Sequence, residues 1–198
     1  MLTQRELHRK LFHLIMGVVT VALIYYEILS AFAIFLIIIV GILLSFLTKR
    51  VRLPIISLFV DHFERDTQKS SFPGRGAIFF FVGALLALKL FDKNIALASI
   101  MVLTLGDSIS HMVGAQYGKM RNIFNGDSNK LLEGTLAGTI VGFLGALIFV
   151  PVPEAFLGCL AAMIAEVMKI DFNDKTIDDN MIIPLVAGTV MLLVGKFV

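Results

Sequence analysis

The chain contains no tryptophan, a single cysteine and few charged residues, and each scarcity narrows what it can be. Cys159 has no partner for an internal disulfide or a cysteine metal site, so its apolar surroundings predict a small buried side chain. There is no block of basic residues and the net charge is only +2, which gives no sign of nucleic-acid binding. Charged residues form 16% of the chain, against about 25% in soluble domains.

Apolar residues, by contrast, form 58% of the 198-residue chain and lie in segments long enough to enter a bilayer. Residues 11–48 contain only two groups that can carry charge near neutral pH, His13 and Glu27. At about 1.5 Å per residue this stretch crosses a ~30 Å hydrocarbon core twice, with a turn at Tyr25-Tyr26-Glu27. Because the first apolar run is so long, we expect it to be kept as a span and not removed as a signal peptide.

The whole pattern predicts an all-α, polytopic bundle of about seven spans that forms one membrane-embedded domain over residues 1–198. The third and sixth spans are short and could be tilted or partly re-entrant. The predicted spans cover residues 8–26, 30–48, 76–91, 94–114, 134–150, 154–170 and 181–197.

Basic residues divide unequally between the two sides of this bundle. Of the 17 Lys and Arg residues, 14 fall with the N-terminus, the loops 49–75, 115–133 and 171–180, and Lys169 at the adjoining end of the sixth span, and 3 fall on the other side. The positive-inside rule then predicts that the N-terminus is cytoplasmic and the C-terminus is on the opposite side. Acidic residues gather on the same face, although acids contribute little to orientation, so something on that face uses carboxylates.

The first cytoplasmic loop contains a short amphipathic segment, residues 54–65, which ends at Arg65. Its apolar residues fall on one helical face, which predicts an interfacial helix lying on the membrane. A plain cytosolic extension of the second span is the alternative.

Two polar groups lie at the cytoplasmic ends of spans one and four. Glu6, Arg9, Lys10 and His13 recur at helical spacing and form a polar stripe. Membrane anchoring would explain Arg9 and Lys10, but it does not suit His13, which lies one turn deeper. In span four, Asp107 is a carboxylate inside the membrane, which is costly unless it is paired or bound to a cation.

His111 follows Asp107 by one helical turn, and three glycines accompany the pair. Gly106, Gly114 and Gly118 either permit close approach of a ligand or pack helices together. For Asp107 the alternative to a functional role is a buried structural pair with Lys or Arg.

Two further groups lie where spans five and seven begin. Lys130 and Glu133-Gly134-Thr135 place a point charge and free helix-start amides on the cytoplasmic face, which suits phosphate. The ladder Gly134, Gly138 and Gly142 is better explained by helix packing.

Asp178-Asp179-Asn180 forms either a helix cap or a hard-metal site for Mg²⁺. Glu166, near the end of span six, is one more buried acid on the same side. Together these groups suit a nucleotide with its metal, bound mainly by residues 104–140 and 166–184. The sequence has neither a Walker loop nor a kinase glycine-rich loop, so the architecture would differ from both.

These motifs, in this order, resemble the polyprenol kinase family, which includes dolichol kinase, phytol kinase and CTP-dependent diacylglycerol kinase. The resemblance covers almost the whole chain. It rests on Glu6-x-x-Arg9-Lys10-x-x-His13-x-x-x-Gly17, Glu64-Arg65 with Phe72-Pro73-Gly74-x-Gly76, Gly106-Asp107 with Gly114 and Gly118-Lys119, Lys130-x-x-Glu133-Gly134-Thr135-x-x-Gly138, and Asp178-Asp179-Asn180-x-x-x-Pro184. Eukaryotic dolichol kinases carry extra spans that this chain lacks, which leaves the substrate open.

The resemblance implies transfer of the CTP γ-phosphate to a membrane lipid alcohol, with Mg²⁺ or another divalent cation as cofactor. Arg9, Lys10, His13 and Asp107 would then be catalytic, with His13 or one of the acids positioning or deprotonating the hydroxyl. The metal would be held by Asp107, Asp178 and Asp179. The implied nucleotide contacts are Gly106, Gly114, Gly118, Lys119, Lys130, Glu133, Gly134 and Thr135. Further candidates are Glu6, Arg65, His111, Glu166 and Asn180.

Two other functions are compatible with parts of the pattern. A phosphatidate cytidylyltransferase also carries Asp with spaced glycines and a Lys-x-x-Glu-Gly motif, but the Arg9-Lys10-x-x-His13 helix and the short chain favour the kinase. A non-enzymatic transporter would place polar residues through the full membrane depth. Here spans two, five and seven are apolar to the far side, and the acids within the spans stop in the cytoplasmic half.

Overall fold

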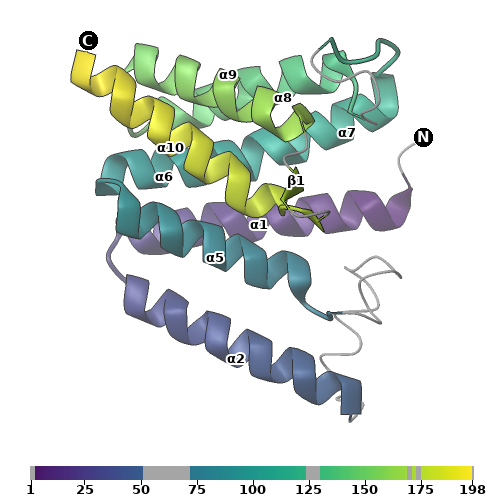
Figure 1. Ribbon diagram of the computed structural model, residues 1–198, viewed down its shortest axis with the longest axis vertical. Helices are drawn as coiled ribbons and strands as arrows, with labels where there is room; N and C mark the ends of the chain where they lie inside the picture. The colour runs from purple at the N-terminus through teal and green to yellow at the C-terminus, as the bar shows by residue number, and fades with distance from the viewer. Residues whose placement is uncertain (1–2, 51–71, 124–129, 169–170, 173–174, 198) are drawn as a thin grey trace.

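The computed structural model describes residues 3–50, 72–123, 130–168, 171–172 and 175–197, and over these residues the chain is almost entirely helical (Figure 1). The only strands among them are two-residue β1 (Asp171–Phe172) and β2 (Lys175–Thr176), an antiparallel pair just before the last helix. The expected α-helical fold is therefore confirmed. The helices are α1 (Gln4–Tyr25), α2 (Ala31–Arg50), α5 (Arg75–Leu90), α6 (Lys93–Met101), η1 (Val102–Asp107), α7 (Ser108–Tyr117), α8 (Leu132–Ala146), α9 (Val152–Met168) and α10 (Asp179–Phe197).

Four helical segments of the described chain are long and apolar enough to cross a membrane: Gln4–Tyr25, Ala31–Thr48, Lys93–Tyr117 and Asp179–Phe197. Lys93–Tyr117 joins α6, η1 and α7 into one continuous helix. Helices α5, α8 and α9 have 16, 15 and 17 residues, fewer than the roughly 20 that a straight crossing needs. Seven crossings therefore stay a prediction. The expected interfacial helix at 54–65, with Arg65, lies outside the described residues.

The turn between the first two helices forms where the sequence predicts it. Helix α1 ends at Tyr25, and Glu27 adopts a left-handed conformation with φ of 62°. Lys93 Nζ, at the start of α6, donates to the Tyr25 carbonyl at 3.2 Å and to Glu27 Oε1 at 2.8 Å. This hydrogen bond and the lysine charge lower the pKa of Glu27, and the contact ties the turn to the central helix.

The continuous helix Lys93–Tyr117 forms the centre of the molecule, and α2 forms one edge (Figure 1). In its most apolar window 72% of the residues are buried, against 17% for α2, which packs mainly on α5. Helices α9 and α10 pack against each other, and α7 packs on α8. Because this central helix is covered on several sides, a charged group on it can be kept out of contact with lipid.

Glycines allow two helices to approach this central helix closely. A Cβ atom at Gly17 of α1 would overlap the Thr104 side chain, and one at Gly138 of α8 would lie 2.7 Å from the Gly106 carbonyl oxygen. Real Cβ atoms essentially never come so near, so only glycine fits at these two crossings. The helix-packing interpretation of the glycines thus has a direct geometric basis here.

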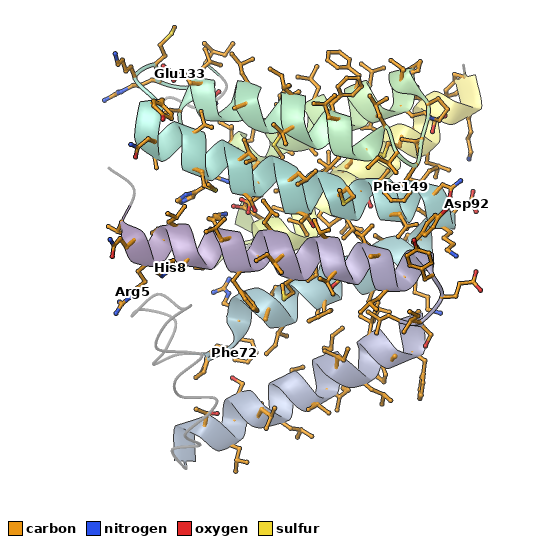
Figure 2. All side chains as sticks on the ribbon, turned by 180° about the vertical axis from the view of Figure 1, so that it is seen from behind. Arg5, His8, Phe72, Asp92, Glu133 and Phe149 are labelled. Carbon is orange, nitrogen blue, oxygen red and sulfur yellow. The ribbon has the colours of Figure 1, made fainter. Side chains whose placement is uncertain are left out.

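The helices alternate in direction, so their connections gather at two opposite ends. Figure 2 shows Arg5, His8, Phe72 and Glu133 toward one end, with Asp92 and Phe149 toward the other. The first of these, called here the charged end, carries the starts of α1, α5, α8 and α10 and the ends of α7 and α9.

Candidate functional site

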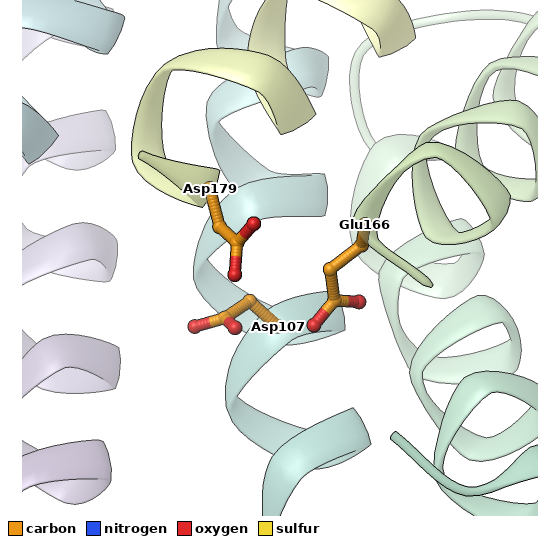
Figure 3. Close-up of side chains that lie close together, drawn as sticks. All are labelled: Asp107, Glu166 and Asp179. Carbon is orange, nitrogen blue, oxygen red and sulfur yellow. The ribbon is translucent and has the colours of Figure 1, made fainter. Parts of the chain in front are cut away.

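Three carboxylates from three separate helices meet near the charged end of the bundle. Asp107 ends η1, Glu166 lies in the last turn of α9, and Asp179 opens α10. One oxygen from each lies within 4.8 Å of the others, and Figure 3 shows the three side chains converging. Asp107 and Glu166 are almost fully buried, with 8% and 1% of their surface exposed. We call these three residues the acid cluster.

Two lysines enter the acid cluster and balance part of its charge. Lys10 Nζ of α1 lies 2.5 Å from Asp107 Oδ2. Lys130 Nζ, just before α8, lies 2.5 Å from Glu166 Oε1 and 2.9 Å from Asp179 Oδ2. Burying these ions is costly without such pairing, because neither lipid nor protein solvates charge as water does.

The charge balance of the cluster remains incomplete within the described chain. Two ammonium groups face three carboxylates, and the second Glu166 oxygen, Oε2, is buried with no hydrogen-bond partner among the described residues. Burial by itself would lower the pKa of Lys130, but the charges of Glu166, Asp179 and Asp107 outweigh it and raise that pKa above its ordinary value. Lys130 therefore stays protonated. The neighbouring oxygen, Glu166 Oε2, can still bind another cation.

A wide helical turn sets the direction in which Asp107 points. Residues Val102–Asp107 form a π-helix inside an otherwise α-helical rod. Such turns are rare and occur frequently at functional sites, because the extra residue changes which face the next side chains occupy. This turn was not part of the sequence prediction, since its signature is geometric and Gly106 is its only suggestive residue.

The acid cluster suits a hard divalent cation. Its donors are all carboxylate oxygens, which Mg²⁺ and Ca²⁺ prefer. One oxygen from each residue lies within 4.8 Å of the other two, so the three side chains could hold one such cation between them.

The acid cluster and the predicted metal ligands share two residues. Asp107 and Asp179 belong to both, but the third acid of the cluster is Glu166, which the sequence marked only as a further candidate. Asp178 Oδ2 instead accepts from Arg75 Nε at 3.3 Å. Its Oδ1 accepts from the backbone and side-chain nitrogens of Asn180, at 3.2 and 2.8 Å, which is the capping role considered as the alternative. Neighbouring residues at a helix start diverge by about 100°, so both could not point inward.

Glu133 and Thr135 organise the backbone and do not join the acid cluster. Glu133 Oε1 accepts from the backbone nitrogens of Lys119 and Met120 at 2.9 and 3.1 Å. Thr135 Oγ1 accepts from Asn122 Nδ2 at 2.8 Å. The backbone amides, including that of Glu133 itself, lower the pKa of this carboxyl, which therefore stays ionised.

Three glycines predicted as nucleotide contacts lie where α7 and the start of α8 pack together, near the hydrogen bonds of Glu133 and Thr135. Gly114 faces Gly134 between α7 and α8, and Gly118 lies against Leu131, where Lys119 begins the return segment. After Gly118 the chain returns across the start of α8, where Leu132 N donates to the Met120 carbonyl at 3.1 Å.

The polar stripe on α1 spreads over several environments. Arg9 pairs with Glu6 at 2.6 Å, while Lys10 enters the acid cluster. His13 packs edge-on against Phe80 of α5 with ring centroids 5.3 Å apart, and its Nε2 is buried without a hydrogen-bond partner in the described chain. The same holds for Nδ1 of His111 on α7.

Comparison with known proteins gives related sequences but no solved structure. No protein-family model and no solved structure match the chain. Uncharacterized protein MJ1137 of Methanocaldococcus jannaschii is 30% identical over 189 residues, which cover 94% of this chain and 93% of that protein.

Two relatives with named activities match more distantly. CTP-dependent diacylglycerol kinase 1 of Schizosaccharomyces pombe is 25% identical over 151 residues, 66% of this chain and 64% of that kinase. CTP-dependent diacylglycerol kinase 1 of Eremothecium gossypii is 28% identical over 169 residues, 75% of this chain and 47% of that kinase. The matches thus span less than two thirds of either kinase. This chain belongs to the family of MJ1137, and its distant homology to the two kinases supports a place among lipid kinases.

Proposed function

We propose that this protein is a CTP-dependent kinase that phosphorylates the hydroxyl of a membrane lipid, either diacylglycerol or a long-chain prenol. The observation that carries the proposal is the buried acid cluster with two inserted lysines at the charged end of an apolar bundle. Carboxylates for a divalent cation and ammonium groups for phosphate are the parts that phosphoryl transfer needs. The distant homology to CTP-dependent diacylglycerol kinases supports the same activity.

In the proposed reaction the lipid hydroxyl oxygen attacks the γ-phosphorus of CTP. A new phosphorus–oxygen bond forms, the bond from that phosphorus to the β–γ bridging oxygen breaks, and CDP leaves. Lys10 and Lys130 turn from the acid cluster toward the phosphate oxygens and neutralise their charge. Asp107, Glu166 and Asp179 would hold Mg²⁺, which when bound supplies charge neutralisation at the transferring phosphoryl group.

The proposed site also needs access from two phases. We place the charged end in the cytoplasm, because 14 of the 17 basic residues lie on that side, so CTP arrives from water. The lipid hydroxyl arrives from the adjoining leaflet. Neither alternative function is favoured: the relatives with named activities are kinases, and Asp107 of the acid cluster lies in the half of the continuous helix Lys93–Tyr117 that is nearer the charged end.

A transfer assay tests the activity. Purified protein is incubated with Mg²⁺, γ-labelled CTP, and either diacylglycerol or a panel of prenols. Label in the organic phase is the expected result, and the preferred acceptor identifies the lipid. Pyrophosphate release with phosphatidate would instead indicate a cytidylyltransferase, and no turnover with any acceptor would reject both enzymes.

Asp107→Asn should abolish transfer in the same assay, because it removes a charge from the centre of the acid cluster. Asp92→Asn is the matched control, since Asp92 is exposed at the opposite end and its side chain makes no capping hydrogen bond. Full activity in Asp107→Asn would remove the acid cluster from the mechanism.

A further inference from the structure

We infer that His13 receives the proton of the lipid hydroxyl, and that the hydroxyl therefore binds on the membrane-core side of the acid cluster. The inference rests on the proposed kinase function and chooses one residue among the possible proton acceptors. It is carried by the depth of His13 and by its Nε2, which has no hydrogen-bond partner among the residues that the structure describes.

The depth follows from how α1 crosses the central helix. Lys10 meets Asp107 and Gly17 meets Thr104, so the two helices run antiparallel. His13 lies three residues beyond Lys10 along α1, about 4.5 Å farther from the charged end. His111 lies four residues beyond Asp107 in the opposite direction, about 6 Å nearer the charged end. The two histidines thus lie on opposite sides of the Lys10–Asp107 pair.

The charged neighbours of the two rings agree with this order. Both rings feel the charges of Lys10, Arg9 and Asp107, but Asp178 acts on His13 whereas Glu6 acts on His111. His111 is therefore the histidine nearer the N-terminal part of α1, where a nucleotide would enter from the cytoplasm. A lipid hydroxyl, which is tethered to its tail in the bilayer, approaches from the side of His13.

The ring of His13 is arranged to accept a hydrogen bond. Its Nε2 is buried and has no partner in the described chain, while Phe80 packs edge-on against the ring and fixes its orientation. A neutral imidazole with its proton on Nδ1 presents a lone pair at Nε2, which can accept from an alcohol. An unsatisfied buried nitrogen costs free energy, so its persistence here is explained by a ligand that supplies the missing donor.

The acids that could compete for this role are already engaged. Asp107, Glu166 and Asp179 each bind a lysine and are the proposed cation ligands. Asp178 is bound by Arg75 and Asn180. In the proposed step the hydroxyl proton passes to His13 Nε2 as the oxygen–phosphorus bond forms, and the negative charge of Asp107 favours the resulting imidazolium.

His13→Gln tests the inference in the labelled-CTP assay. Glutamine keeps a polar group of similar reach but cannot take up the proton, so kcat should fall by about 10²-fold or more while the KM for CTP and CTP binding stay unchanged. His8→Gln is the matched control, because His8 is an exposed histidine on the same helix, and its kcat should equal that of the unaltered protein.

A rescue experiment separates proton acceptance from simple packing. His13→Ala should regain activity with added imidazole but not with pyrrole, a ring of similar shape that lacks the accepting nitrogen. Equal rescue by both rings, or a kcat for His13→Gln within about threefold of the unaltered protein, would overturn the inference while leaving the kinase function intact. Absence of transfer by the unaltered protein would reject the kinase function itself. If His13→Gln does not fold, the His13→Ala rescue decides alone.

Discussion

At the scale of single residues, Lys130 combines structural and chemical roles in one side chain. It joins Glu166 of α9 to Asp179 of α10, and it stands at the entrance to α8. In the proposed reaction it must leave both carboxylates when a cation enters and turn to phosphate. Lys130 thus stabilises the protein in the absence of ligand and is displaced from the carboxylates when the ligand binds.

Lys130→Met should therefore lower stability as well as activity. Glu166 would be left as an unpaired buried carboxylate, which costs about 3 to 5 kcal/mol when one partner of a buried pair is removed. The double variant Lys130→Met with Glu166→Gln should recover most of the stability, because neither charge remains, yet stay inactive. Thermal unfolding in detergent, with the labelled-CTP assay beside it, measures both effects. A single variant as stable as the unaltered protein would mean that Lys130 does not stabilise the cluster.

The sequence was most informative about which residues make up the candidate site. The sequence identifies Asp107, Lys10 and Lys130 as candidates. A charged residue beside an apolar span costs free energy unless it is paired or has a function. The choice of Glu166 over Asp178 could not be predicted. It depends on the angle at which α10 begins, and two adjacent acids look equivalent in the sequence until one of them caps the helix.

At the scale of helices, the crossing of α1 over η1 holds the two halves of the site together. Gly17 allows this crossing, and Lys10 and His13 lie within two turns of it on the same helix. A change at the crossing should therefore act on the site through geometry alone, without touching any charged residue.

Gly17→Ala should reduce activity more than the small volume of the added methyl group suggests. The added methyl group would overlap Thr104 and push α1 away from η1, which costs about 1 to 3 kcal/mol and lengthens the Lys10–Asp107 contact. Gly76→Ala is the matched control, because a Cβ atom there meets nothing within 4 Å. Activity and thermal stability of both variants give the answer. If Gly17→Ala behaves like its control, the crossing is looser than the structure indicates.

At the scale of the whole molecule, the charged end and the far end are predicted to face different compartments. Cys159 is the only cysteine and is fully buried, so newly introduced cysteines can report on exposure. In intact cells an impermeant thiol reagent should label Asp92→Cys but not Arg5→Cys, and both should react after permeabilisation. The reverse pattern would place the acid cluster on the outer side and exclude cytosolic CTP as its donor.

The positions of the helices along the chain followed well from the sequence, and the way they pack in space did not. Hydropathy marks apolar segments, and each predicted span corresponds to a helix in the described chain. Periodicity cannot say which helix lies at the centre, because α2 is the most apolar of the four long segments and yet is the least buried. In a membrane, apolar character indicates contact with lipid as readily as contact with protein.

The π-helical turn before Asp107 has a consequence for comparing relatives. Such a turn holds one residue more than an α-helix would need over the same rise, so it behaves as a one-residue insertion. Removing that residue would rotate every later position of the helix by about 100° and swing Asp107 away from Lys10. Sequences that share this acid cluster should therefore keep the spacing from Lys93 to Asp107 unchanged. When a relative is aligned with this chain, a gap inside that interval indicates that its aspartate faces elsewhere, however high its overall sequence identity.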